Sequence, residues 1–226
     1  MSLHFSHSIH YVHNLDDVAR QFSHYGLALQ NKSQDALTSA SAFLSPYVEF
    51  FSLNKQENND RNFLKQEANL YLPVQQIFGR IALSTSHLEE LKHRFKKAGH
   101  KISAPISGKH SNGTKWQGFT ILTDYNHLLY PLFIDQKSSV TKQEAPTLKN
   151  IYFRVENPQS VCEHWQEILH LKPLYIKGKQ ALQIDNFHLI FEKGKINRLH
   201  SLEFEATDWP VSQTEFRIGQ GFYRFN

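Results

Sequence analysis

One pattern of secondary structure recurs three times along the 226-residue chain, and it limits the possible folds more than any other feature. Each copy begins with a strand-like run, continues into a helix with one apolar face, and ends with three short strand-like runs. The strand and helix of the copies fall at residues 8–26, 79–99 and 149–170. Repeated β-α-β-β-β units predict an α+β protein, because each helix covers one face of the sheet that its strands form.

Start and stop signals fit a helix in each copy. Asn14 and Gly26 suit the N-cap and the C-terminal end of the first helix. In the second copy Ser86 and Glu89 form the pattern of a capping box, and in the third Pro158 falls in the first helical turn. The apolar stripe of the first helix consists of Leu15, Val18, Ala19, Phe22 and Tyr25.

The end of the chain begins a fourth unit but supplies no helix. In the strand expected at 198–208, apolar side chains alternate with Glu203 and Glu205. A strand with one charged face is typical of a sheet that no helix covers. We therefore predict three full modules and a truncated fourth of two strands, the last within 213–226.

Three segments interrupt the repeat. Residues 54–62 are polar and predict a loop, and residues 63–72 predict a short helix that leads into the second unit. Residues 136–147 are typical of a linker. We therefore expect two domains, 1–136 with the first pair of modules and 146–226 with the third module and the truncated fourth.

Composition excludes several functional classes. Cys162 is the single cysteine, so neither an internal disulfide nor a cysteine-based zinc site is expected. No apolar run approaches the roughly 20 residues of a membrane span, and the first residues lack the apolar stretch of a signal peptide, so we expect a cytoplasmic protein with no membrane partner. The net charge is +4, but lysines and arginines are scattered, which argues against a nucleic-acid partner and suits anionic small molecules.

A histidine stands at every third position of "HFSHSIHYVH", residues 4–13. The residues between them favour a strand, in which side chains alternate between two faces. His7 and His13 then point one way, and His4 and His10 the other. One strand cannot bring all four together, so any metal site needs ligands from elsewhere in the chain.

The unit and its motifs resemble the vicinal oxygen chelate superfamily, which includes glyoxalases, extradiol dioxygenases and fosfomycin-resistance proteins. The opening "SHSIHYVHNL" is similar to the superfamily's "DHVVLxVxDL", and "YVEFFSL" to its closing "YxELxx". The resemblance implies that two modules curl into a cup, with His7 and Glu49 at metal-ligand positions. "FGRIALS" places Arg80 where a second histidine is expected, and "YPLFI" places Pro131 at the second glutamate.

The later part, "GKHSNGTKWQG…YPLFIDQ", is similar to the glyoxalase-like family, although the "H-P-x-x-G-T" run of that family is missing from "NKSQDALTSA". A guanidinium cannot ligate a metal, and two unit charges 4 Å apart repel by about 4 kcal/mol at an effective dielectric of 20. We therefore expect no metal cofactor, with Arg80 paired to Glu49. The alternative is a divalent metal at His7 and Glu49.

We expect the first cup to bind a small anionic or carbonyl-bearing molecule. His7 and Glu49 are the candidate catalytic residues for proton transfer. The candidate ligand-binding residues are Tyr11, Arg80, Lys109, His110 and Trp116. The second cup would be a packed core, since Leu202 and Phe204 make it apolar around Asn150 and His200.

Several alternatives stay open. An Arg–Glu pair inside a barrel is also explained as a satisfied polar pair without chemistry. The chain could instead be a metal-dependent lyase, isomerase or dioxygenase, or a protein that sequesters a small molecule without turnover. The sequence leaves open whether the protein is an enzyme, and a homodimer is compatible with modules of this type.

Overall fold

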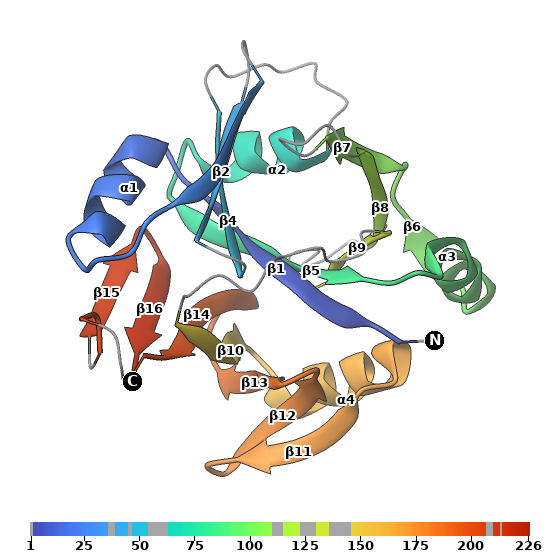
Figure 1. Ribbon diagram of the computed structural model, residues 1–226. Coiled ribbons are helices and arrows are strands. Elements are labelled where there is room, and N and C mark those ends of the chain that lie inside the picture. The colour runs from blue at the N-terminus through green and yellow to red at the C-terminus, as the bar shows by residue number, and fades with distance from the viewer. Residues whose placement is uncertain are drawn as a thin grey trace.

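The computed structural model describes residues 2–35, 39–44, 47–53, 63–109, 115–122, 130–135, 146–206, 210–212 and 214–226 (Figure 1). The predicted loop at 54–62, residues 136–145 of the predicted linker, and His110 lie outside this range. Among the helices within it, none combines the length and the apolar composition that crossing a bilayer would require.

The first two modules form one nine-stranded sheet, in the order β2-β3-β4-β1-β5-β9-β8-β6, with β7 paired to β8. The first module contributes β1 (His4–Tyr11), α1 (Leu15–Ser23), β2 (Gln30–Asp35), β3 (Ser39–Leu44) and β4 (Val48–Leu53). The second contributes β5 (Ile77–Ser84), α3 (Leu88–Lys97), β6 (Lys101–Ile102), β7 (Ile106–Lys109), β8 (Lys115–Leu122) and β9 (Leu132–Ile134). The helix α2 (Phe63–Tyr71) lies between the two modules in the chain.

The rest of the chain forms a seven-stranded sheet, in the order β11-β12-β13-β10-β14-β16-β15. The third module contributes β10 (Thr147–Val155), α4 (Pro158–Leu169), β11 (Lys172–Ile176), β12 (Lys179–Ile184) and β13 (Phe187–Lys193). The fourth contributes β14 (Arg198–Glu205), β15 (Thr214–Ile218) and β16 (Gly221–Phe225). The α+β fold of curved mixed sheets built from repeated modules is therefore confirmed, although the fourth module has three strands rather than two.

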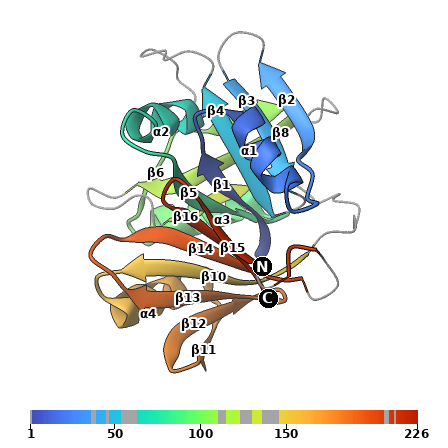
Figure 2. The same cartoon turned by 90° about the vertical axis from the view of Figure 1, so that its left-hand side faces the viewer.

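The two sheets lie against each other through their apolar faces, with the first above the second in Figure 2. The described residues of the fourth module include no helix, and α1 of the first module covers its last strands instead. The ring of Phe22 lies 5.0 Å from that of Phe216 and 5.4 Å from that of Tyr223, centre to centre. Because one apolar cluster spans both sheets, the domain boundaries at 1–136 and 146–226 stay a prediction.

His10 belongs to this shared cluster. Its side chain is fully buried, and its Nδ1 lies 2.5 Å from the hydroxyl of Tyr223 on β16. Burial lowers the pKa of His10 to about 3, so the imidazole is neutral at pH 7. His10 is therefore a hydrogen-bonded histidine of the core, on the face of β1 opposite to His7.

Two local predictions are wrong. The N-cap of α3 is His87, and its side chain makes no capping hydrogen bond, so Ser86 and Glu89 form no capping box. Instead the hydroxyl of Thr85 accepts from the backbone N–H of His87 at 3.2 Å. The strand-like run "LALQN", residues 27–31, predicts a second strand from Leu27, but the strand begins at Gln30, and Leu27 belongs to the apolar cluster.

Candidate functional site

The site begins with the two faces of β1. Phe22 of α1 packs on Phe50, so this helix covers one face of the first sheet. Ile9 and Tyr11 point to the opposite face, which we call the first cup. The apolar lining of the first cup comprises Ile9, Tyr11, Phe51, Ala82, Ile106, Leu132 and Ile134.

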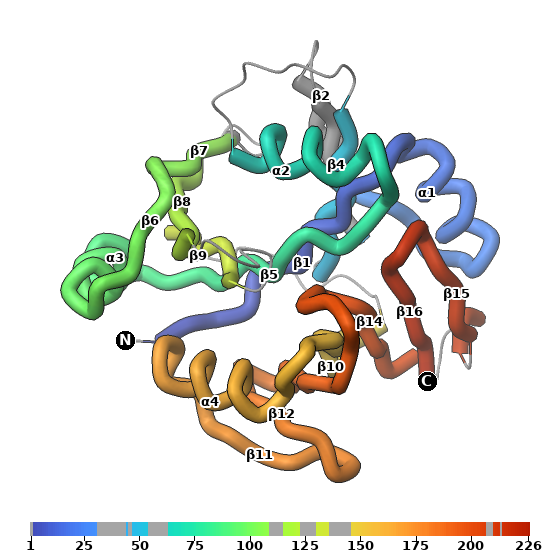
Figure 3. Tube along the Cα trace, turned by 180° about the vertical axis from the view of Figure 1, so that it is seen from behind, coloured from blue at the N-terminus to red at the C-terminus, as the bar shows by residue number. Residues whose placement is uncertain are grey.

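The helix α2 packs into the first cup. Its residues Leu64 and Ala68, and Leu72 just beyond its end, belong to the same buried cluster as the lining. Seen from behind in Figure 3, α2 lies between β4 and β7, across the curl of the sheet. The predicted short helix exists, but it fills part of the cup rather than only connecting two modules.

Arg80 enters the first cup from a bulge in β5. Ser8 pairs with Ile81 and His10 with Phe78, so Gly79 and Arg80 on β5 both lie opposite the single residue Ile9. Bulges of this kind change the direction of a side chain. Gly79 is also required by close packing, since a Cβ at this position would lie 2.5 Å from the ring of Tyr11.

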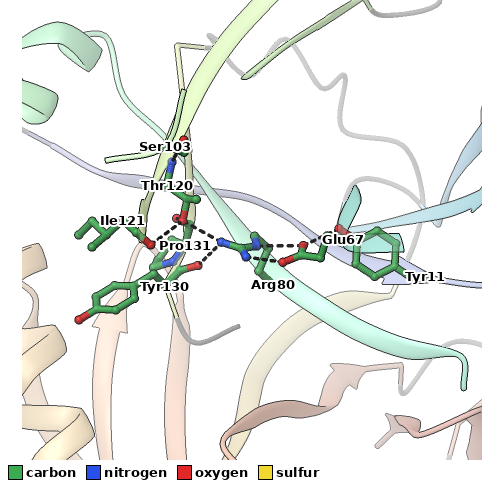
Figure 4. A network of polar contacts seen from close by, with 8 residues as sticks. All are labelled: Tyr11, Glu67, Arg80, Ser103, Thr120, Ile121, Tyr130 and Pro131. Atoms are coloured by element: carbon green, nitrogen blue, oxygen red, sulfur yellow. Dashed lines mark hydrogen bonds and ion pairs between the residues drawn. The ribbon is translucent and has the colours of Figure 1, made fainter. Parts of the chain in front are cut away.

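The Arg80 guanidinium is fully buried and pairs with Glu67 of α2, not with Glu49 as predicted (Figure 4). Its Nε donates to Glu67 Oε2 at 3.1 Å, and its Nη2 donates to Glu67 Oε1. Its Nη1 donates to the hydroxyl of Thr120 at 2.7 Å and to the carbonyl oxygen of Tyr130 at 3.0 Å. The guanidinium is thus held by a bidentate carboxylate and two further acceptors.

Charge and burial act together on this network. Burial alone would lower the pKa of Arg80, but the Glu67 carboxylate and its hydrogen bonds, with Tyr11 and Tyr71, raise it above its usual value. Tyr11 donates to Glu67 Oε2 at 2.5 Å, and burial and the Glu67 charge raise the pKa of this phenol well above 10. The arginine therefore stays charged and Tyr11 stays protonated at any physiological pH.

His7 and Glu49 form a second pair in the first cup, as the resemblance placed them. His7 Nε2 lies 3.2 Å from Glu49 Oε2, and His7 Nδ1 lies 2.9 Å from the Ser6 hydroxyl. The two side chains are 11% and 16% exposed, so solvent reaches both. The two side chains are thus close enough to form an ion pair when the imidazole is protonated.

The remaining predicted site residues lie around the β7–β8 hairpin. Trp116 is half-buried against the apolar lining of the first cup, and a Cβ at Gly108 would lie 2.6 Å from its indole. Lys109 ends β7 and pairs in register with Lys115. His110 lies outside the described residues. The structure thus brings Tyr11, Arg80 and Trp116 to the first cup, along with His7 and Glu49.

Glu67 is the residue that sequence reasoning missed. It lies on a helix whose buried positions Leu64, Ala68 and Leu72 recur every four residues, and Glu67 adjoins this stripe. A carboxylate beside the apolar stripe of an inserted helix was a usable signal. The motifs of the resemblance end before residue 54 and resume near 79, so they offered no match for it.

The residues of the first cup fit a divalent metal poorly. His7 and Glu49 supply two ligands, Arg80 cannot ligate, and Glu67 is occupied by Arg80 and Tyr11. Metals of this class usually take at least three protein ligands. Across the described ranges, no group of three or more histidine, cysteine, aspartate or glutamate side chains could hold a metal ion.

The second cup, which we define as the face of the second sheet opposite α4, is not the apolar core that was predicted. Trp165 of α4 packs on Phe153, and Leu202 and Phe204 belong to the same apolar cluster on that side. Side chains alternate along a strand, so the second cup receives the polar positions of β14 instead, next to a small buried cluster of Tyr152, Ala181 and Ile190. Tyr152 donates there to Glu203.

Comparison with known proteins assigns the chain to a family. A family model described as "Glyoxalase-like domain" matches residues 5–169. A search of proteins with curated descriptions finds no match to the sequence. Among solved structures, a hypothetical protein from Staphylococcus aureus is similar over 100% of this chain and 99% of its own, with 18% identity and a TM-score of 0.82.

Two further solved structures are enzymes. The Mn(II)-bound glyoxalase from Novosphingobium aromaticivorans is 14% identical, with a TM-score of 0.57 over 91% of this chain and 66% of its own. A mutant of 4-hydroxymandelate synthase from Streptomyces coelicolor is 12% identical, with a TM-score of 0.60 over 92% of this chain and 72% of its own. At these identities the likeness concerns the fold. The chain belongs to the glyoxalase-like domain family and has the fold of the vicinal oxygen chelate superfamily.

Proposed function

We propose that the first cup binds a small carbonyl-bearing or anionic molecule beside His7 and Glu49, without a metal ion. The observation that carries this proposal is the fully buried Arg80 guanidinium, bonded to Glu67 where a metal-binding relative would have its second histidine. The guanidinium cannot ligate a metal, and it occupies both carboxylate oxygens of Glu67, so neither residue adds a ligand to His7 and Glu49.

His7 and Glu49 are the proposed proton-transfer groups. The Nε2 of His7 lies 3.2 Å from Glu49 Oε2, and the Ser6 hydroxyl lies 2.9 Å from the other ring nitrogen, so the imidazole has a polar neighbour on each side. Glu49 can accept a proton from a carbon acid or hydroxyl of the ligand, and His7 can stabilise the carboxyl group that results. Their residual exposure gives a small molecule access to them.

The other predicted residues have supporting roles in this proposal. Arg80 and Tyr11 hold Glu67 and thereby fix α2 against the first cup. Trp116 offers a flat aromatic wall. Lys109 ends β7, the strand paired with that of Trp116, and His110 follows it in the sequence; in this proposal both attract the negative charge of an anion.

A metal-dependent lyase, isomerase or dioxygenase is the second candidate. It is favoured by one comparison, the Mn(II)-bound glyoxalase whose fold this chain shares. A protein that sequesters its ligand without turnover would use the same groups as the first candidate. Formation of product from a bound compound would distinguish an enzyme from a sequestering protein.

The first test is a thermal-shift screen of small carbonyl compounds and carboxylates against wild type, His7→Asn and Glu49→Gln. The matched control is the surface pair His87–Glu90, with Nδ1 and Oε1 3.1 Å apart, changed to His87→Asn and Glu90→Gln. We expect compounds that stabilise the wild type and both control variants but neither cup variant. If no compound separates Glu49→Gln from wild type, the proposal fails.

The second test is elemental analysis of protein purified without chelator, followed by thermal shift with manganese and zinc. We expect substoichiometric metal and no specific stabilisation. Near-stoichiometric metal that is lost in both His7→Asn and Glu49→Gln would establish the metal-dependent alternative instead.

A further inference from the structure

The second cup carries a row of charged side chains, most of which have partners. Lys179 pairs with Glu192, and Arg224 donates through Nε to Glu215 at 2.6 Å. Glu203 accepts from the hydroxyl of Tyr152 and, at 2.9 Å, from the side-chain amide of Asn226. All of these carboxylates are thus engaged by groups of the second cup itself.

Arg154 and Arg198 are the exception. They are cross-strand partners in the register of β10 and β14, so two like charges lie directly opposite each other. Glu192 lies opposite Arg154 on its other side, in β13, but its carboxylate pairs with Lys179. Within the described part of the chain, neither arginine side chain forms a hydrogen bond or an ion pair. Like charges in this position destabilise a sheet unless something neutralises them. Arg154 is exposed and Arg198 is half-buried, so a ligand from solvent can reach both.

His200 is the third member of this group. Tyr152 pairs with Ser201 and Phe153 with Leu199, so His200 is the extra residue of a bulge in β14. It is 1% exposed, and neither ring nitrogen has a hydrogen-bond partner among the residues described. Burial and the charges of Arg154, Arg198 and Arg224 lower the pKa of His200 to about 4. At pH 7 it is a neutral imidazole with one unused N–H donor.

We propose that Arg154, Arg198 and His200 form an oxyanion-binding site in the second cup, for the phosphate or carboxylate group of a small molecule. Two guanidinium groups on adjacent strands can share the oxygens of one such group, which removes their repulsion. The ring nitrogens of His200 are covered by neighbouring side chains, so its N–H becomes a further donor to the same anion once those side chains move aside. Buried polar groups are nearly always hydrogen-bonded, and a bound oxyanion accounts for the exception here.

The surroundings indicate that the oxyanion belongs to an organic molecule. The ring of Phe222 lies 4.7 Å from that of His200, and the Arg217 guanidinium lies over Phe222 at 5.8 Å. Aromatic and cationic groups beside an anion site favour a ligand whose acidic group is attached to a flat or apolar body. This site is separate from the first cup and does not depend on the function proposed there.

The proposal is tested by thermal shift of the full chain with inorganic phosphate and, separately, with malonate. Ionic strength is held constant with chloride, so that screening is equal in all samples. We expect one or both anions to raise the Tm of the wild type. Phosphate alone would indicate a phosphate ligand, and malonate alone a carboxylate. No rise with either anion would overturn the proposal.

The variants are Arg154→Gln and Arg198→Gln, with Arg20→Gln as the matched control. Arg20 lies on α1, with a side chain 76% exposed and an ion pair to Asp17. We expect Arg198→Gln to abolish the rise and, at low salt without anion, to have a Tm equal to or above that of the wild type. An unchanged rise in both second-cup variants would contradict the site.

A measurement on the wild type avoids dependence on variants that fail to fold. The imidazole carbon–proton signal of His200, assigned by its loss in His200→Asn or, failing that, from triple-resonance spectra, should shift with phosphate or malonate. Chloride at the same ionic strength should leave it unchanged. A His200 signal whose chemical shift stays the same with both anions would overturn the proposal.

Discussion

The two cups are built from the same kind of module, but they differ in whether their arginines are buried and paired with a carboxylate. In the first cup Arg80 is fully buried and bonded to both oxygens of Glu67. In the second cup Arg154 and Arg198 lie opposite each other, and the neighbouring carboxylate of Glu192, across from Arg154 on β13, is paired with Lys179 instead. The first cup contains the inserted helix α2, whereas the second cup has no covering helix in the described part of the chain.

The difference shows how burial dictates pairing. A charge removed from water loses several kcal/mol of solvation, and only a partner with good geometry compensates for this loss. At a half-exposed position, water and salt screen the charge, so a sequence can leave it unpaired for a ligand. Insertion of α2 therefore changes the first cup from a surface of polar groups into a partly filled interior.

The largest expected effect comes from Glu67→Gln. This change leaves the buried Arg80 without its carboxylate, and we expect a loss of about 3–5 kcal/mol in the free energy of unfolding. Urea denaturation followed by circular dichroism measures it. The double variant Glu67→Leu with Arg80→Met should recover most of the loss. A loss below about 1 kcal/mol would show that the first cup tolerates an unpaired cation as the second does.

An intermediate effect is expected at the contact between the two sheets, where His10 is buried. Its folded pKa of about 3 lies below the ordinary value near 6.5, so the unfolded chain binds more protons as pH falls through this window. Stability is then lost progressively below pH 6.5. Between pH 7 and pH 5 we expect His10 to account for about 2 kcal/mol.

This prediction is checked by unfolding curves at several pH values for wild type and for His10→Phe combined with Tyr223→Phe. The double variant removes the titrating group and also its hydrogen-bond partner. Its stability should fall less steeply with acid. Parallel curves for the two proteins would show that another group controls acid unfolding.

The smallest effect is expected for Glu192→Gln in the second cup. Glu192 pairs with Lys179, whose side chain is 44% exposed, and such pairs contribute up to about 1 kcal/mol. We expect a change below that value in the urea experiment used for Glu67→Gln. A loss as large as that of Glu67→Gln would remove the distinction between a buried and a screened pair.

Much of this fold was predictable from local patterns. The strand and helix periods of "SIHYVHNLDDVARQFSHYG" and its two later copies predict the modules, because each pattern reports which side chains one element buries. The same register places His7 and Glu49 on one face, and they lie 3.2 Å apart. The partner of Arg80 was not predictable in this way, because Glu67 reaches it only when α2 packs into the first cup.

The sequence by itself thus determined the repeated modules, the missing fourth helix and the family, since these depend on periodicity and short motifs. The tertiary structure alone decided that Glu67 neutralises Arg80, that α1 covers β15 and β16, and that Leu202 faces the first sheet while Glu203 faces the second cup. The physical reason is that alternation gives a strand two faces but does not say which of them will be buried. That choice depends on the elements that pack against the strand from distant parts of the chain.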